Sequence, residues 1–187
     1  MKKNIATVSS RLFDPFVVIT AIMILAFSRS GLSPIVAIKL FIAVYTVAVL
    51  VPVMLLLFAI RRKTIDSWDI PKRHMRLVPL GIEFAATLIG YGVVLRFGNE
   101  FLVQLFMLLL VWLAGFFCIT AFWKVSGHVG TAALGTGLLV HWFGWGAWPF
   151  LLVIPILSWA RVVRHDHTIA QVIAGAIYSW ILIFILT

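Results

Sequence analysis

The chain has 187 residues, of which 63% are apolar and only 11% are charged. Soluble domains average about 45–50% apolar and about 25% charged residues, so this composition excludes a soluble domain and a disordered protein. The single cysteine, Cys118, can form no internal disulfide, which excludes a disulfide scaffold. We therefore expect one integral membrane domain over residues 1–187. It has no soluble part that could bind nucleic acid.

Apolar stretches near the length that crosses a bilayer, about 20 residues, recur along the chain. We expect spans near 12–30, 35–60, 80–97, 101–122, 129–145, 149–161 and 168–186. The sixth is short enough to merge with a neighbour, and the first is an anchor that follows a basic tail, residues 1–11. Close helix packing is expected at four small residues of the fifth span, Gly130, Ala133, Gly135 and Gly137. The predicted fold is an all-α, polytopic membrane bundle of six to seven transmembrane helices.

Basic residues gather on one face of this predicted bundle. With seven spans, the tail and the loops 61–79, 123–128 and 161–167 share a face and carry twelve of the 15 Lys and Arg residues. The other face carries three, Arg29, Lys39 and Arg96. Because cytoplasmic loops are enriched in Lys and Arg, we expect a multi-pass protein of the cell (inner) membrane whose basic face lies in the cytosol.

The polar residues of these loops suit the chemistry of a phosphate group. Arg and Lys bind phosphate oxygens, and a Ser-Gly pair before a helix adds a hydroxyl and backbone N–H groups. Two histidines can supply a nucleophile and a general acid. Few carboxylates can approach this face, namely Asp66, Asp69, Glu83 and Asp166. Two-metal phosphatases need several convergent oxygen ligands, so we expect no metal and no cofactor.

Two short motifs carry a family resemblance. Ser126-Gly127-His128 and the run from Arg161 to His167 resemble the motifs P-S-G-H and S-R-x5-H-x3-D of the type-2 phosphatidic acid phosphatase superfamily of membrane lipid phosphatases. Val125 replaces the proline of the first, and Ala160 and Gln171 replace the serine and the aspartate of the second. The family's further motif, K-x6-R-P, is matched in residue types but not in full spacing by residues 72–79, KRHMRLVP. The resemblance covers about residues 61–180.

The resemblance implies a core like that of the family and hydrolysis of a lipid phosphate or diphosphate through a phosphohistidine. His167 would attack phosphorus, and His128 would protonate the leaving oxygen and then activate water. Arg161, Ser126 and the amides of Gly127 and His128 would bind the phosphate oxygens. The cations of the K-x6-R-P motif, Lys72 and Arg76, would bind them too, with Arg73 as an alternative to Lys72. The implied partners are a lipid phosphate substrate and membrane lipids.

Gln171 stands where the family has an Asp that accepts a hydrogen bond from the nucleophilic histidine. A Gln carbonyl can accept this bond but brings no charge, so orientation should survive while charge stabilisation weakens, unless Asp166 compensates. The run continuing through Gly175 looks like the polyprenyl diphosphatase branch, which favours an isoprenoid phosphate as substrate. Two alternatives stay open: a lipid-phosphate binding or transport protein without turnover, and a helper subunit of an envelope-lipid enzyme.

Overall fold

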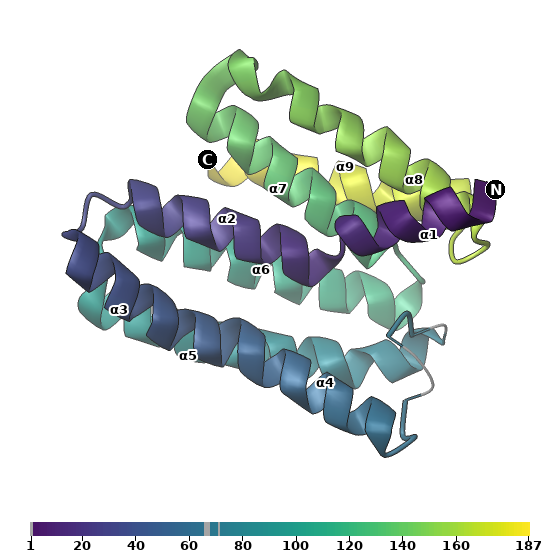
Figure 1. Ribbon diagram of the computed structural model, residues 1–187, viewed down its shortest axis with the longest axis horizontal. Coiled ribbons are helices and arrows are strands. Elements are labelled where there is room, and N and C mark those ends of the chain that lie inside the picture. Colours follow the sequence, from purple (N-terminus) through teal and green to yellow (C-terminus); the bar gives the residue numbers. More distant parts are fainter. Residues whose placement is uncertain (1, 66–67, 71) are drawn as a thin grey trace. The chain divides into compact units, whose positions relative to one another are not determined.

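The computed structural model describes residues 2–65, 68–70 and 72–187, and the regular structure in this part of the chain is helical (Figure 1). Among the described residues, six segments are long and apolar enough to cross a membrane: Lys2–Arg29, Pro34–Arg61, Arg73–Phe97, Glu100–Phe122, Gly127–Val163 and Ile169–Leu186. They indicate a multi-pass integral membrane protein, and they confirm the prediction of an all-α membrane fold.

The chain divides into two compact units. The motif unit combines Met1–Ile19 with Lys124–Thr187 and contains both motifs of the family resemblance. The middle unit is Thr20–Trp123. The helices assigned mainly to the middle unit are α2 (Pro15–Arg29), α3 (Pro34–Tyr45), η1 (Thr46–Leu50), α4 (Val51–Arg61), η2 (Arg73–Arg76), α5 (Leu77–Phe97) and α6 (Glu100–Phe122).

A π-helical turn, η1, joins α3 and α4 of the middle unit into one long segment. There the N–H of Val51 donates to the carbonyl of Thr46, five residues earlier. Pro52 follows directly. Because proline has no N–H and its ring crowds the carbonyl four residues before it, a regular α-helical turn is disfavoured at this point.

Polar contacts fix the two ends of the middle unit. At one end Asn99 caps α6 by accepting the N–H of Leu102 at 3.2 Å, and its amide donates to the carbonyl of Ser30. At the other end the guanidinium of Arg73 donates to the last carbonyls of α6, those of Ala121 (3.1 Å) and Phe122. Helix ends leave backbone groups without intrahelical partners, and these side chains satisfy some of them.

The motif unit contains α1 (Lys2–Leu12), α7 (Gly127–Phe143), η3 (Gly144–Leu152), α8 (Val153–Val163) and α9 (Ile169–Leu186). The chain reverses direction at η3, so α7 and α8 run antiparallel (Figure 1). Gly144 begins the reversal at a positive φ of 68°, a conformation that glycine adopts readily. The reversal itself, Gly144–Leu152, is a 3-10 helix. The reversal places the start of α7 and the end of α8 at the same end of the unit.

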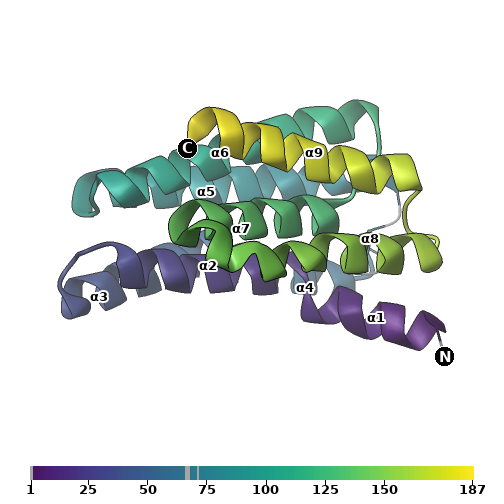
Figure 2. The same ribbon diagram turned by 90° about the horizontal axis from the view of Figure 1, so that it is seen from above.

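Small residues bring α7 and α9 close together, side by side (Figure 2). The hydroxyl of Ser179 donates to the carbonyl of Gly130 at 2.8 Å, and Gly137 lies directly against the side chain of Ile183. Such spacing of small residues permits backbones to approach in membrane helices. The packing predicted at Gly130 and Gly137 is confirmed.

The segment before the first expected span is helical and not an irregular basic tail. Helix α1 packs along α8, and its residues Ala6 and Ser10 are buried. Phe13, just after α1, packs against a buried apolar cluster made of Val129, Ala132, Leu157 and Val172. The contact of Phe13 with this cluster anchors the junction between α1 and α2.

Candidate active site

The Ser126-Gly127-His128 motif forms the start of α7. Ser126 is its N-cap residue: its Oγ accepts the N–H of Val129 at 3.4 Å, and its carbonyl accepts the N–H of Gly130 at 2.9 Å. Serine is favoured here because its short side chain satisfies an N–H that has no partner within the helix. The backbone N–H groups of the first turn, including those of Gly127 and His128, lie at the positive end of the helix dipole. An anion is favoured at such an end.

The Arg161–His167 motif is a helix end that folds back on itself. Arg161 lies in the last turn of α8 with only 2% of its side chain exposed. Its carbonyl accepts the N–H groups of both Asp166 (3.1 Å) and His167 (3.3 Å). The turn uses a left-handed residue, His165, at φ 61°. This fold-back holds the His167 backbone against the turn that carries Arg161.

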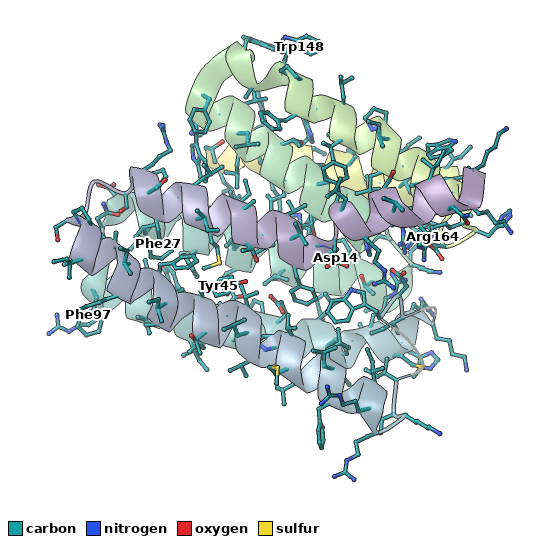
Figure 3. The ribbon with its side chains drawn as sticks, viewed as in Figure 1. Asp14, Phe27, Tyr45, Phe97, Trp148 and Arg164 are labelled. Carbon is teal, nitrogen blue, oxygen red and sulfur yellow. The ribbon has the colours of Figure 1, made fainter. Side chains whose placement is uncertain are left out.

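Asp166 forms ion pairs with the two arginines of this turn. Its Oδ2 lies 2.7 Å from Nε of Arg164 and 3.3 Å from an NH group of Arg161. The carbonyl of Asp166 accepts from the ammonium group of Lys124 at 2.7 Å. Figure 3 labels Arg164 at the end of α8. Buried arginines are rare unless they are paired, and here Asp166 supplies the anion for Arg161.

His167 is 6% exposed and is oriented by the start of α9. Its Nδ1 lies 3.2 Å from Oε1 of Gln171, and the same oxygen accepts the N–H of Thr168 at 3.1 Å. In return, Oγ1 of Thr168 accepts the N–H of Gln171 at 3.3 Å, which completes a capping box. The N–H of Thr168 can only donate, so it keeps the amide oxygen, and not the NH₂ group, toward His167.

These contacts select one form of the His167 ring. Because Oε1 of Gln171 can only accept a hydrogen bond, the proton of the neutral imidazole belongs on Nδ1. The lone pair is then on Nε2. This is the contact that the sequence predicts for Gln171 in place of an aspartate, and it leaves the ring in the form that a nucleophile requires.

One backbone hydrogen bond and one lysine side chain join the motifs within the motif unit. The N–H of Ser126 donates to the carbonyl of Gln171 at 3.2 Å, and Lys124, two residues before Ser126, reaches the loop that holds His167. Gly175 of α9 lies against the carbonyl of Ser126. The start of α7, the end of α8 and the start of α9 therefore meet at one end of this unit.

The imidazole of His128 faces a carboxylate, Asp14, that is not among the site residues expected from the sequence. Oδ2 of Asp14 lies 3.7 Å from Nε2 of His128, and only 8% and 13% of the two side chains are exposed. Asp14 stands between α1 and α2 (Figure 3). The signal in the sequence is an acidic residue next to a proline inside an apolar stretch, since ionisable groups there are costly.

The cations of the K-x6-R-P motif, Lys72, Arg73 and Arg76, lie in the middle unit. Arg73 caps α6 as described above, and Nε of Arg76 donates to the carbonyl of Ile70 at 2.7 Å. Lys72 directly precedes η2 and is exposed. Their participation in a phosphate site stays a prediction from the sequence.

Two of the remaining expected carboxylates, Asp69 and Glu83, belong to the middle unit, and Asp66 lies outside the described residues. Among the residues that the structure describes, no group of three His, Cys, Asp or Glu side chains is arranged to hold a metal ion.

Comparison of the chain with protein-family models, with curated proteins and with solved structures gave no significant match.

Proposed function

We propose that this protein is a membrane lipid phosphatase that hydrolyses a lipid phosphate or diphosphate through a phosphohistidine. The observation that carries the proposal is the Thr168–Gln171–His167 arrangement, in which a fixed amide oxygen holds Nδ1 and leaves the lone pair on Nε2. Arg161 precedes His167 in the same folded-back turn, which suits binding of an anion beside the nucleophile.

The first step transfers the phosphoryl group to the protein. Nε2 of His167 attacks phosphorus, the bond between phosphorus and the lipid oxygen breaks, and the imidazolium of His128 gives a proton to that oxygen. Arg161 neutralises charge on the non-bridging oxygens, the role that metal ions have in kinases. Ser126 and the first N–H groups of α7 supply further hydrogen bonds.

The second step releases phosphate. His128, now neutral, takes a proton from a water molecule whose oxygen attacks phosphorus. The phosphorus–nitrogen bond breaks, and the electron pair returns to Nε2 of His167. Both histidines end in their starting states, so the cycle consumes one water and needs no cofactor.

The placement of polar and apolar surfaces supports the proposed substrate class. The motif unit presents polar groups at one end, while many of its large apolar side chains are exposed along the helices, including Ile173, Ile177 and Phe184 of α9. A substrate with a phosphate head and a tail in lipid matches that surface. The resemblance of residues 161–175 to the polyprenyl branch favours an isoprenoid diphosphate over phosphatidate.

We place the phosphate-binding end in the cytosol, since twelve of the 15 basic residues lie on the predicted face that carries the motifs. Helix α9 has 18 residues and runs away from His167, so its C-terminal end lies about 27 Å from its start. A reporter fused after Thr187 should therefore be found outside the cytosol. A cytosolic signal would contradict this orientation.

The deciding experiment measures phosphate release by the purified protein in detergent with a chelator, beside His167→Ala. The panel contains phosphatidate, phosphatidylglycerophosphate, and polyprenyl mono- and diphosphates. Chelator-resistant release that disappears in the variant supports the proposal, and the best substrate identifies the branch. Absence of release, with lipid phosphates still bound, favours the binding or transport alternative.

A further inference from the structure

The junction between α1 and α2 is built around Asp14. Its Oδ1 accepts the N–H of Phe16 at 3.1 Å and its carbonyl accepts the N–H of Val18 at 3.0 Å, while Pro15 takes the first position of α2. These are the contacts of an N-cap residue. Asparagine and serine cap helices about as well as aspartate, so capping alone does not call for a charge at this position.

The second carboxylate oxygen has a different neighbour. Oδ2 of Asp14 lies 3.7 Å from Nε2 of His128, and both side chains are largely buried. A buried carboxylate is costly unless another charge compensates for it. Attraction between opposite charges is stronger here than in water because the surroundings are less polar. The negative charge of Asp14 therefore favours the imidazolium form of His128.

Packing holds the side chains of Asp14 and His128 next to each other. Phe13 packs against the cluster that includes Val129, the residue after His128, and α1 lies along α8. The carboxylate thus reaches His128 from a helix junction that is held by the packing of Phe13 and α1 and by the bond from the N–H of Phe16. Its position does not depend on a long flexible side chain.

We propose that Asp14 is a positioning residue for the general acid of the reaction. This inference rests on the proposed function. Asp14 orients the ring of His128 through Nε2 and stabilises the imidazolium, so that the proton on Nδ1 passes to the leaving lipid oxygen as the phosphorus–oxygen bond breaks. In the second step His128 regains a proton from water, and Asp14 again stabilises the imidazolium that forms.

Asp14→Asn separates the charge of Asp14 from its capping role, because the Asn side-chain oxygen can still accept the N–H of Phe16. The two substrates compared are a lipid phosphate, whose alkoxide needs a proton in order to leave, and nitrophenyl phosphate, whose phenolate leaves without one. We expect Asp14→Asn to lower kcat/KM for the lipid about 10- to 100-fold, within the contribution of acid catalysis. The value of kcat/KM for nitrophenyl phosphate should stay close to wild type, because kcat/KM reports the first step and not the hydrolysis of the phosphohistidine that both substrates share. The thermal midpoint should also stay close to wild type. Glu100→Gln, which removes an exposed charge in the first turn of α6, is the matched control.

A double-mutant cycle tests whether Asp14 acts through His128. We expect His128→Ala to lower lipid turnover about 10²- to 10⁴-fold, and Asp14→Asn to cause no further loss in that background, since residues that act as one unit are not additive. Full additivity would overturn the inference. So would equal losses of kcat/KM on both substrates, or a wild-type kcat/KM for the lipid in Asp14→Asn.

Failure of this inference is distinguishable from failure of the proposed function. If the wild-type protein releases no phosphate, or if His167→Ala remains active, the phosphatase proposal fails and the role of Asp14 fails with it. If release depends on His167 but Asp14→Asn behaves like Glu100→Gln, only the role of Asp14 is rejected.

Discussion

Gly175 lies so close to the backbone of Ser126 that a Cβ placed on it would be 2.8 Å from the Ser126 carbonyl oxygen. The same Cβ would lie 3.4 Å from the backbone nitrogen of Gly130. These neighbours are backbone atoms of the first turn of α7, which cannot rotate away as a side chain can. The glycine therefore lets α9 approach the turn that carries His128.

The close approach predicts that Gly175→Ala destabilises the protein. We expect a loss of about 1–3 kcal/mol in unfolding free energy, the usual range for overpacking a tight site. Lipid phosphatase activity should fall as well, because the start of α7 must move. Thermal unfolding in detergent and phosphate release are the measurements.

Gly92→Ala is the matched control for this substitution. Gly92 lies within α5, and nothing is found within 4 Å of the position that its Cβ would occupy. Alanine is favoured over glycine in a helix by about 1 kcal/mol, so this variant should be as stable as wild type or more so. If Gly175→Ala were equally well tolerated, the close contact would not affect the unfolding free energy, and the prediction would be wrong.

Removal of the acceptor at Gln171 should impair the chemical step. Gln171→Leu keeps a similar volume but offers no oxygen to Nδ1 of His167, so the ring is no longer held in one form. We expect kcat to fall about 10- to 100-fold, as for other losses of a group that orients a functional histidine. KM should change little, since Arg161 still provides the charge for phosphate binding.

Two further variants distinguish orientation from general damage. Gln171→Glu keeps an acceptor and a capping box, so activity should be retained. Thr168→Ala should cost about 1 kcal/mol of stability through the lost cap and lower kcat, whereas Thr168→Ser should restore both. Wild-type kcat in Gln171→Leu would show that Gln171 does not orient His167.

Arg73 offers a test between its helix-capping contact and the phosphate-binding role implied by the resemblance. Its guanidinium donates to the carbonyls of Ala121 and Phe122 at the end of α6, a contact that stabilises a helix C-terminus by about 0.3–1 kcal/mol. We expect Arg73→Gln to lower the thermal midpoint slightly and to leave kcat and KM for the lipid nearly unchanged.

Arg161→Gln provides the comparison for Arg73. Loss of a cation that stabilises the transition state costs roughly 10²- to 10³-fold in kcat, so this variant should be nearly inactive. An Arg73→Gln protein that loses activity to the same degree, with normal thermal stability, would favour phosphate binding by Arg73 over capping.

The sequence was a good guide where local chemistry decides the outcome. The apolar stretches predicted membrane helices, because only helices satisfy their own backbone groups over such lengths. Gln171 follows His167 by four residues, a spacing that brings side chains together at the start of a helix. The capping serine and threonine, Ser126 and Thr168, likewise stand directly before the helices that they cap.

The sequence was a poor guide where a contact joins residues far apart in the chain. Asp14 was expected inside the first span, and its place beside His128 depends on the packing of α1 along α8. The contact of Arg73 with the carbonyls of α6 likewise depends on how the start of α5 lies against α6, and its role at the phosphate, as an alternative to Lys72, stays a prediction. Neither contact follows from spacing.

The sequence alone determined that this chain is an all-α membrane protein with two histidine motifs in a set order, because hydrophobicity and helix capping act within a few residues. Asp166 pairs with Arg161 and Arg164 within a single turn of the chain. Tertiary packing decided that Asp14 lies beside His128, since these two residues are far apart in the sequence. The physical reason is that a charge buried in an apolar protein needs a partner within a few ångströms. Only the folded backbone determines which partner lies within that distance.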